Sequence, residues 1–233
     1  MYATRSRARL AHPPSMAGAL LVAGLCVVAL ALTWVVAALV PATHVRDAVA
    51  LHDFTLLGGG RGDDLANALL HLLEPALYIL WAVLLIGVAL RRRRPRVALA
   101  VAVVMGMAPL TAELLKPLLA HPHAPIYGDE ITAASWPSGH ASAATALVMS
   151  AVLVAPHRLR PTVALLGAIF AAAVGFSLVL LAWHLPSDVL GGYLLGTLWT
   201  ALAVAGLRGA EARSRSRSSR VGSGVGAMRA GVP

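Results

Sequence analysis

Charged residues are scarce in this sequence. Only 12% of its 233 residues are Asp, Glu, Lys or Arg, about half the share that is usual in a soluble domain. This scarcity excludes a soluble enzyme, a disordered chain and a nucleic-acid-binding domain as the main identity of the protein. Aromatic residues are also few, at 5%, and the apolar residues do not alternate with polar ones as they do in the strands of a membrane barrel.

Cysteine and acidic residues are also in short supply. The one cysteine, Cys26, lies in an apolar run, which excludes a disulfide framework and leaves the redox compartment open. Basic residues outnumber acidic ones by 19 to 10, and the resulting net charge of +9 would normally indicate an anionic partner. Here the positions of the basic residues matter more than their sum.

Long apolar runs are abundant, since 58% of the residues are hydrophobic. A helix needs about 20 mostly apolar residues to cross a bilayer. We therefore predict an all-α, polytopic membrane protein with a bundle of six transmembrane helices, at residues 16–41, 67–90, 97–115, 141–155, 162–183 and 187–207. A basic N-terminus, 1–15, precedes this membrane domain of residues 16–208, and a basic tail of Arg and Ser, 209–233, follows it with a composition that indicates disorder.

The basic residues predict the orientation of the bundle. Six spans place both termini on one side, and of the 19 basic residues only Arg46, Arg61 and Lys116 fall in segments assigned to the other side. Because cytoplasmic segments carry the excess of Lys and Arg, we predict cytoplasmic termini in a plasma membrane. The first span follows a basic stretch, as a signal peptide does, but its apolar run exceeds the roughly 7–15 residues of a signal-peptide core, which favours an uncleaved helix.

Two segments on the predicted outer side are polar enough to hold a site. The first, 42–66, contains Asp63 and Asp64, which suit a divalent metal, but the spacing fixes no third ligand, and a flexible solvated loop is the preferred interpretation. The second, 116–140, contains more residues that are able to bind or react with a phosphate. It holds Lys116, His121 and His123 and ends on Pro137-Ser138-Gly139-His140.

The Pro-Ser-Gly-His stretch has the features of an anion site at a helix start. Pro137 suits a first helical turn, and Gly139 lets the backbone approach a ligand closely. Free backbone N–H groups in such a turn, here those of Ser138 and Gly139, bind phosphate. His140 follows at the mouth of the fourth predicted span.

A second histidine occurs at the corresponding end of the next hairpin. Asp188 follows His184 by four residues, so one helical turn brings the two side chains together. A carboxylate that holds one imidazole nitrogen makes the other a better base or nucleophile, and a buried charge in a membrane is costly and usually functional. A structural His–Asp pair at the interface is the alternative interpretation.

Both histidines lie on the outer side under the six-span prediction, and together they suggest phosphoryl transfer. His184 would attack phosphorus and form a phosphohistidine, while His140 would protonate the leaving alkoxide and then assist water. Lys116 and the amides of Ser138 and Gly139 would hold the phosphate oxygens. This arrangement requires no metal and no cofactor.

These residues resemble the type 2 phosphatidic acid phosphatase / haloperoxidase superfamily. Its second motif is complete at residues 137–140, and its third is present as Ser177, His184 and Asp188 at the family spacing. The resemblance covers about residues 67–207, with the motifs between 116 and 188. It implies a lipid-phosphate phosphatase that hydrolyses a phosphate monoester or pyrophosphate at the outer membrane face, with phosphatidic acid, a polyprenyl (di)phosphate and a sphingoid phosphate all admissible as substrates.

The first and third motifs depart from the family pattern. His123 stands where the first motif has Arg, and Leu178 replaces the Arg that follows Ser177. In the family those arginines grip the phosphate, and Leu supplies no bidentate charge. Protonated His121 and His123 would compensate in part. The alternative is a weak or inactive relative that binds a lipid or acts as a scaffold; in both cases the predicted partners are membrane lipids and not nucleic acid.

Overall fold

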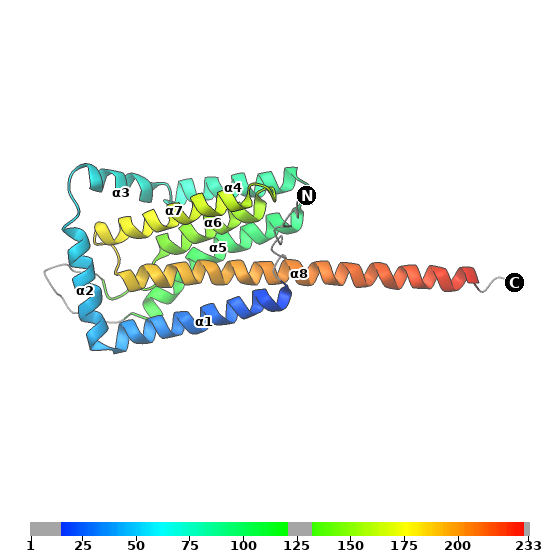
Figure 1. Ribbon diagram of the computed structural model, residues 1–233, viewed down its shortest axis with the longest axis horizontal. Helices are drawn as coiled ribbons and strands as arrows, with labels where there is room; N and C mark the ends of the chain where they lie inside the picture. Colours follow the sequence, from blue (N-terminus) through cyan, green and yellow to red (C-terminus); the bar gives the residue numbers. More distant parts are fainter. Residues whose placement is uncertain (1–14, 121–131, 231–233) are drawn as a thin grey trace, which may run out of the picture.

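The protein is a bundle of helices in the computed structural model, which describes residues 15–120 and 132–230, with side chains as far as 214. Every regular element of the described residues is a helix, so the all-α prediction is confirmed. The helices are α1 (Met16–Leu39), α2 (Pro41–Thr55), α3 (Arg61–His71), α4 (Pro75–Arg91), α5 (Pro95–Leu118), α6 (Gly139–Val154), α7 (Arg160–Leu180) and α8 (Pro186–Ala230). Figure 1 shows the long helices side by side, with α2 across one end.

Five of the six predicted spans coincide with one helix each. By length and composition, α1, α5, α7 and the Pro186–Ser214 part of α8 are able to cross a membrane, and α3 and α4 qualify together as a bent pair. The remaining apolar helix, α6, has 16 residues. Large apolar side chains stay exposed on the outside of the bundle, as at Leu21 and Leu165. Such a surface suits lipid, which supports a multi-pass membrane protein.

The second predicted span, 67–90, is wrong at its start because the chain breaks between α3 and α4. The two helices are bent by 52° relative to one another. Glu74 has extended backbone with a ψ of 151°, since a residue that precedes proline avoids the α-helical region. The break brings Nδ1 of His71 to 2.8 Å from Oε1 of Glu74.

The first outer loop, predicted as flexible and solvated over 42–66, is instead mostly helical. Pro41 starts α2 at a position where its missing N–H costs nothing, and Gly60, with a φ of 50°, turns the chain into α3. Leu51 of α2 and Leu70 of α3 are 3% and 1% exposed, so each helix is fixed by burying an apolar side chain. Short helices of this kind lack the long apolar run on which the prediction relies.

The C-terminal tail, predicted as disordered from residue 209, is helical to Ala230 as the continuation of α8. Figure 1 shows this part of α8 running beyond the other helices. Extending a helix that is already nucleated gains one hydrogen bond for each residue fixed. A prediction from composition alone overlooks that preceding helix.

The helix α8 packs against α1, α5 and α6. Glycines let it approach α6 closely: a Cβ added at Gly192 would lie 2.6 Å from the carbonyl oxygen of Ser138, and one at Gly196 would lie 2.6 Å from Cβ of Thr145. Small residues four apart allow this kind of contact between membrane helices. The contact brings the start of α6 against the start of α8.

Candidate functional site

The first histidine turn lies at the start of α6. Ser138 is the N-cap of this helix, and its Oγ accepts a 3.3 Å hydrogen bond from the amide of Ala141. Serine is favoured there because its side chain satisfies an amide that the helix leaves unpaired. Gly139 and His140 form the first turn, where a helix offers their N–H groups no carbonyl partner. These two amides have the geometry that an anion site at a helix start needs.

Ser138 itself has its polar groups engaged within the protein. Its side chain is fully buried, and its N–H donates a 2.9 Å hydrogen bond to the backbone carbonyl of Asp188. The amide of Ser138 therefore joins the two histidine turns instead of facing a ligand, which differs from the role predicted for it. The N–H groups that stay open to a phosphate in this turn are those of Gly139 and His140.

The second histidine turn connects α7 to α8. The N–H groups of Trp183 and His184 donate to the carbonyl of Leu178, at 2.9 and 3.3 Å. Nδ1 of His184 lies 3.4 Å from Oδ2 of Asp188, and the same oxygen accepts the N–H of Leu185 at 3.1 Å. The side chains of the His–Asp pair are 11% and 1% exposed. With Nδ1 donating to the carboxylate, Nε2 of His184 is the nitrogen left for chemistry.

Lys116 reaches the first histidine turn from the end of α5. A Cβ added at Gly139 would lie 3.9 Å from Nζ of Lys116 and 2.6 Å from Oε1 of Glu113, so any side chain larger than glycine would displace these groups. Nζ of Lys116 lies 2.7 Å from Oε1 of Glu113, as expected for residues three apart on a helix. A cation thus lies next to the open amides of α6, together with the carboxylate of Glu113 that pairs with it and lies closer to Gly139.

His140 has different surroundings from His184. It is half-buried, and its ring meets that of Trp183 edge to face, with 5.7 Å between the centroids. A cavity of about 390 Å³ opens beside it, with Asn67 and His71 of α3 and Glu74 at the α3–α4 break among its lining residues. No motif spacing points to these three residues, although a Glu-Pro step inside a predicted span is a signal of the break.

Of the two positions at which the family has an arginine, the structure describes the one that Leu178 occupies. Leu178 is fully buried within the main hydrophobic core. His121 and His123 fall outside the described residues, so their compensating role stays a prediction.

Within the described residues, no group of three or more His, Cys, Asp or Glu is placed to hold a metal. Oδ1 of Asp63, in the first outer segment, instead accepts the N–H of Gly59 at 3.1 Å.

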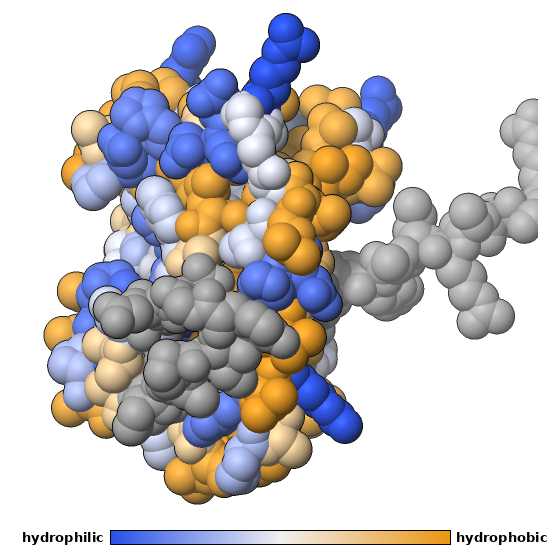
Figure 2. Space-filling view, turned by 90° about the vertical axis from the view of Figure 1, so that its left-hand side faces the viewer, coloured by the Kyte–Doolittle hydropathy of each residue, from blue (hydrophilic) through white to orange (hydrophobic). Residues whose placement is uncertain are grey.

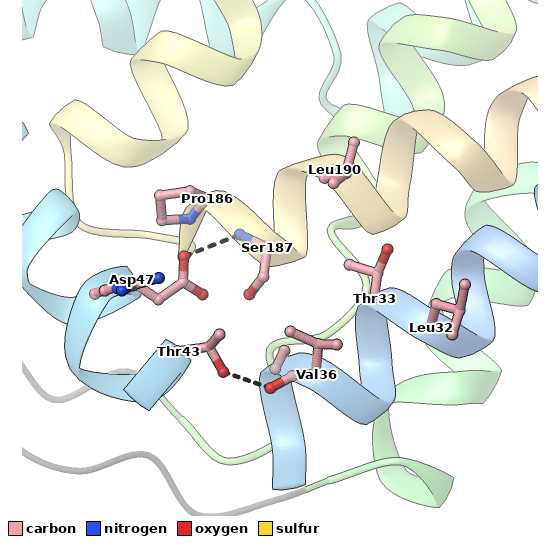
Figure 3. A pocket seen from close by; sticks show the side chains of 10 residues that line it. Leu32, Thr33, Val36, Thr43, Asp47, Pro186, Ser187 and Leu190 are labelled. Carbon is pink, nitrogen blue, oxygen red and sulfur yellow. Dashed lines mark hydrogen bonds between the residues drawn. The ribbon is translucent and has the colours of Figure 1, made fainter. Parts of the chain in front are cut away.

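Asp47 of α2 also contacts the site, and no motif in the sequence points to it. Its Oδ1 accepts the N–H of Ser187 at 3.3 Å (Figure 3), so it caps the start of α8 beside Asp188. The pKa of Asp47 is raised above its usual value, mainly because the carboxyl is buried. The hydrogen bond from Ser187 lowers this pKa in part, and the negative charge of Asp188 raises it further. The cavity of about 520 Å³ that Asp47 lines lies between α1, α2 and the start of α8.

Both histidine turns lie at the end of the bundle that α2 crosses (Figure 1). Hydrophilic and hydrophobic residues are mixed over this end of the molecule, as Figure 2 shows. The basic run 91–94, between α4 and α5, lies at the other end (Figure 1). The candidate site and this basic run are therefore separated by the length of the bundle.

Comparisons with known proteins give two findings. The family described as the PAP2 superfamily matches residues 96–210, a range that contains Lys116 and both histidine turns. Among solved structures, the chain is similar to a transmembrane PAP2-type phosphatidylglycerolphosphate phosphatase from Bacillus subtilis, with a TM-score of 0.66 and 21% identity, over 78% of this chain and 93% of that one. This likeness supports the fold. No curated protein matches the sequence.

Proposed function

Because the chain belongs to the PAP2 superfamily, we propose that it is a membrane lipid phosphatase, which hydrolyses a phosphate monoester or pyrophosphate of a lipid through a phosphohistidine on His184. The observation that carries this proposal is the buried His184–Asp188 pair, which a backbone hydrogen bond joins to the turn that bears His140. A nucleophile oriented by a carboxylate, beside a second acid–base group, is what a two-step displacement needs.

The first step transfers the phosphoryl group to the enzyme. Nε2 of His184 attacks phosphorus, the P–O bond to the lipid breaks, and His140 donates a proton to the leaving oxygen. Asp188 stabilises the positive charge that develops on the imidazole of His184. The products are the lipid alcohol, or a lipid monophosphate where the substrate is a pyrophosphate, and a phosphohistidine.

The second step releases phosphate. His140, now without its proton, accepts one from a water molecule as the water oxygen attacks phosphorus. The P–N bond breaks, its electron pair returns to Nε2 of His184, and inorganic phosphate leaves. The enzyme then holds the same protons as at the start, so one water is consumed for each ester hydrolysed.

Charge builds on the phosphate oxygens in both steps, and cations or amides placed there lower the barrier. We assign this role to Lys116 and to the amides of Gly139 and His140, and we propose that His121 and His123 add charge when protonated. Their contribution would appear as phosphate release that rises as the pH falls below about 6.5, the ordinary pKa of histidine. A pH profile that is the same after both are replaced by Ala would remove them from the site.

A second candidate function is that of a lipid-binding or scaffold protein without turnover. The observation that favours it is the burial of Leu178 in the core at a position where the family has an arginine. Removing one preorganised charged contact costs about 3 kcal/mol of transition-state stabilisation, so two losses would lower the rate by about four orders of magnitude. The intact His140, His184 and Asp188 support turnover.

We further propose that the reaction takes place at the outer face of a plasma membrane, with both termini in the cytoplasm. The support is the basic run 91–94 at the end of the bundle opposite the histidine turns (Figure 1), since cytoplasmic loops are enriched in Lys and Arg. A reporter fused after Pro233 is expected on the cytoplasmic side. A reporter found outside would contradict the orientation and with it the outer-face site.

Phosphate release by the purified protein in detergent tests the activity. The substrates are phosphatidic acid, a polyprenyl diphosphate and a sphingoid phosphate, between about pH 5 and 8. The variants are His184→Ala and, as a matched control, His157→Ala, which removes an exposed histidine between α6 and α7. We expect the wild type and the control to release phosphate from at least one lipid about 10⁴-fold faster than His184→Ala, or more. No release above that variant would sink the phosphatase and leave the lipid-binding function.

A further inference from the structure

The helix α1 lies outside the range that the family matches, residues 96–210, yet it contacts the end of α5 that carries Lys116. It packs against α8 (Figure 1). Near its C-terminal end, Nε1 of Trp34 donates a 3.0 Å hydrogen bond to the backbone carbonyl of Leu119. This bond joins residues that are 85 positions apart in the sequence, and it ties α1 to the last turn of α5.

The last turn of α5 has one internal hydrogen bond fewer than a regular helix. Lys116 lies in this turn, and Pro117, which follows it, has no N–H to donate to the carbonyl four residues before it. The C-cap is Leu119, whose N–H still donates to the carbonyl of Leu115 at 2.9 Å. Carbonyls at the end of a helix have no partner within the helix, so the bond from Trp34 satisfies one of them and fixes the turn from outside.

The same contact belongs to an apolar cluster that extends to the first histidine turn. The buried members of this cluster are Leu30, Ala112, Trp136 and Leu195, and Trp34 and Leu119 pack against them. Trp136 is 2% exposed and lies two residues before Ser138, the N-cap of α6. The indole of Trp34 thus packs in one cluster with residues of α5 and of the chain that leads into α6, which are the two segments that bring Lys116 close to Gly139.

The position of this turn matters because few cations are available to a phosphate. Of the cationic positions in the family motifs, Lys116 is the one kept within the described residues, since Leu178 replaces an arginine. Nζ of Lys116 also pairs with Oε1 of Glu113 at 2.7 Å. Both side chains start from the end of α5, so a shift of this end moves the whole pair relative to Gly139.

We propose that Trp34 is a positioning residue for Lys116: its indole N–H holds the last turn of α5 so that the ammonium group reaches a phosphate bound at the amides of Gly139 and His140. This inference rests on the proposed function, because it takes the phosphate contact of Lys116 from it. Trp34 itself touches no substrate. The phosphate site is therefore incomplete without α1, although the family range does not include this helix. If Trp34 served only for packing between helices, its donor would affect stability and not phosphate binding.

A matched pair of variants tests the proposal. Trp34→Phe keeps an aromatic ring and removes the donor to Leu119. Trp199→Phe makes the same change on α8, where Nε1 donates to Oγ1 of Thr111 of α5 at 3.1 Å. We expect Trp34→Phe to raise KM for a lipid phosphate about fivefold, which is the worth of about one hydrogen bond, and Trp199→Phe to change it by less than about twofold. A variant that only loses folded molecules lowers kcat and leaves KM unchanged. Equal KM values for the two variants would overturn the proposal.

A double-mutant cycle shows whether the effect of Trp34 passes through Lys116. In the Lys116→Ala background the ammonium group is absent, so adding Trp34→Phe should change KM by less than about twofold. Melting temperatures in detergent confirm that each variant is folded. A rise of about fivefold in the Lys116→Ala background as well would show that Trp34 acts without Lys116. That result would overturn the positioning role and leave the phosphatase standing.

Binding of inorganic phosphate keeps the proposal testable without turnover. Its dissociation constant, measured by equilibrium dialysis in detergent, should be about fivefold higher for Trp34→Phe than for the wild type and for Trp199→Phe. Equal dissociation constants for Trp34→Phe and the wild type, or a wild type that binds no phosphate, would overturn the positioning role whatever the release assay shows. Weaker phosphate binding by Trp34→Phe, together with a wild type that hydrolyses no lipid phosphate, would overturn the phosphatase alone.

Discussion

The two histidine turns differ in almost every physical respect, although each stands at the start of a helix on the same end of the bundle. His184 is buried and paired with a buried carboxylate at 3.4 Å. His140 is half-buried, lies edge-on against Trp183 and borders an open cavity. A nucleophile gains from a fixed tautomer and from exclusion of water, whereas a group that exchanges protons with a leaving group and with water needs access.

This contrast supports the two roles that we propose for residues of the same type. In the proposed mechanism the carboxylate of Asp188 fixes which nitrogen of His184 carries the proton, so that the ring presents the other nitrogen to phosphorus. His140, half-buried against the edge of Trp183 and next to a cavity, is suited to give up a proton and take it back. The following predictions test whether the contrast holds, beginning with the largest effect.

Single replacements of His184 and His140 should separate the role of nucleophile from that of acid–base group, if each variant is tested on substrates with different leaving groups. His184→Ala is expected to lower kcat/KM by about 10⁴-fold or more for a lipid phosphate, and to give no burst of p-nitrophenol from p-nitrophenyl phosphate, because no nucleophile remains. His140→Ala should lose about 10²–10⁴-fold on the lipid. It should nevertheless give a burst of p-nitrophenol and then stall, because that leaving group departs without a general acid, whereas the attacking water still needs a base to accept its proton. Equal bursts in the two variants would contradict the assignment.

Asp188→Asn removes the feature that distinguishes the turns while keeping the shape of the side chain. The amide no longer favours a proton on Nδ1 of His184, so kcat is expected to fall by about 10²–10⁴-fold. Stopped-flow phosphate release checks this, with melting temperature as the control for folding. Activity within about threefold of the wild type would show that the carboxylate is structural.

The contact between the turns depends on Gly192, where an added Cβ would lie 2.6 Å from the carbonyl oxygen of Ser138. Gly192→Ala is expected to cost about 1–3 kcal/mol of folding free energy, as overpacking does, and to lower activity by moving the first turn. Gly206→Ala is the matched control, since an added Cβ there meets nothing within 4 Å; it should be neutral or stabilising by up to about 1 kcal/mol. Scanning fluorimetry in detergent compares the two, and equal melting temperatures would refute the close contact.

Asp47 should have the smallest effect, on stability more than on rate. Asp47→Ala removes an acceptor at the start of α8 and is expected to cost about 1 kcal/mol, seen as a melting temperature lowered by a few degrees. Asp47→Asn keeps an acceptor and should be milder.

The pH dependence of these variants follows from the raised pKa of Asp47. A carboxyl with a raised pKa binds its proton more tightly in the folded protein than in the unfolded chain. Its protonation therefore favours folding at low pH, and this contribution is lost as the pH rises through the folded pKa. The stability of Asp47→Asn relative to the wild type should accordingly increase as the pH rises. A difference that is constant with pH would contradict the burial of this carboxyl.

Much of the fold could be predicted because a bilayer imposes a simple rule on sequence. A run of about 20 apolar residues is long enough to cross it, and five of the six predicted spans coincide with one helix each. Elements outside the rule were missed for physical reasons. The helix α2 buries one leucine, Leu51, in place of a long run, and the break at Glu74 comes from the proline that follows it. The last part of α8 continues a helix that other residues nucleate.

The candidate site was predictable where its chemistry sits in side chains at fixed spacing. Four residues between His184 and Asp188 predict a contact across one helical turn, and the two side chains do meet. Asn67 and His71 could not be found this way, because they approach His140 only through the bend between α3 and α4. The amide of Ser138 was assigned to a ligand because no sequence pattern shows where a backbone N–H points.

That amide has a consequence for how the protein can be dissected and how it can change. The 2.9 Å bond from Ser138 N–H to the Asp188 carbonyl is made of main-chain atoms, so an alanine scan leaves it untouched. Among the natural residues only proline at position 138 would delete the donor. Because this hydrogen bond involves main-chain atoms alone, it does not depend on which side chains stand at the two positions. The two turns can therefore keep their relative position while neighbouring residues are substituted. A chain that has Leu178 in place of an arginine can in this way still hold both histidines in position.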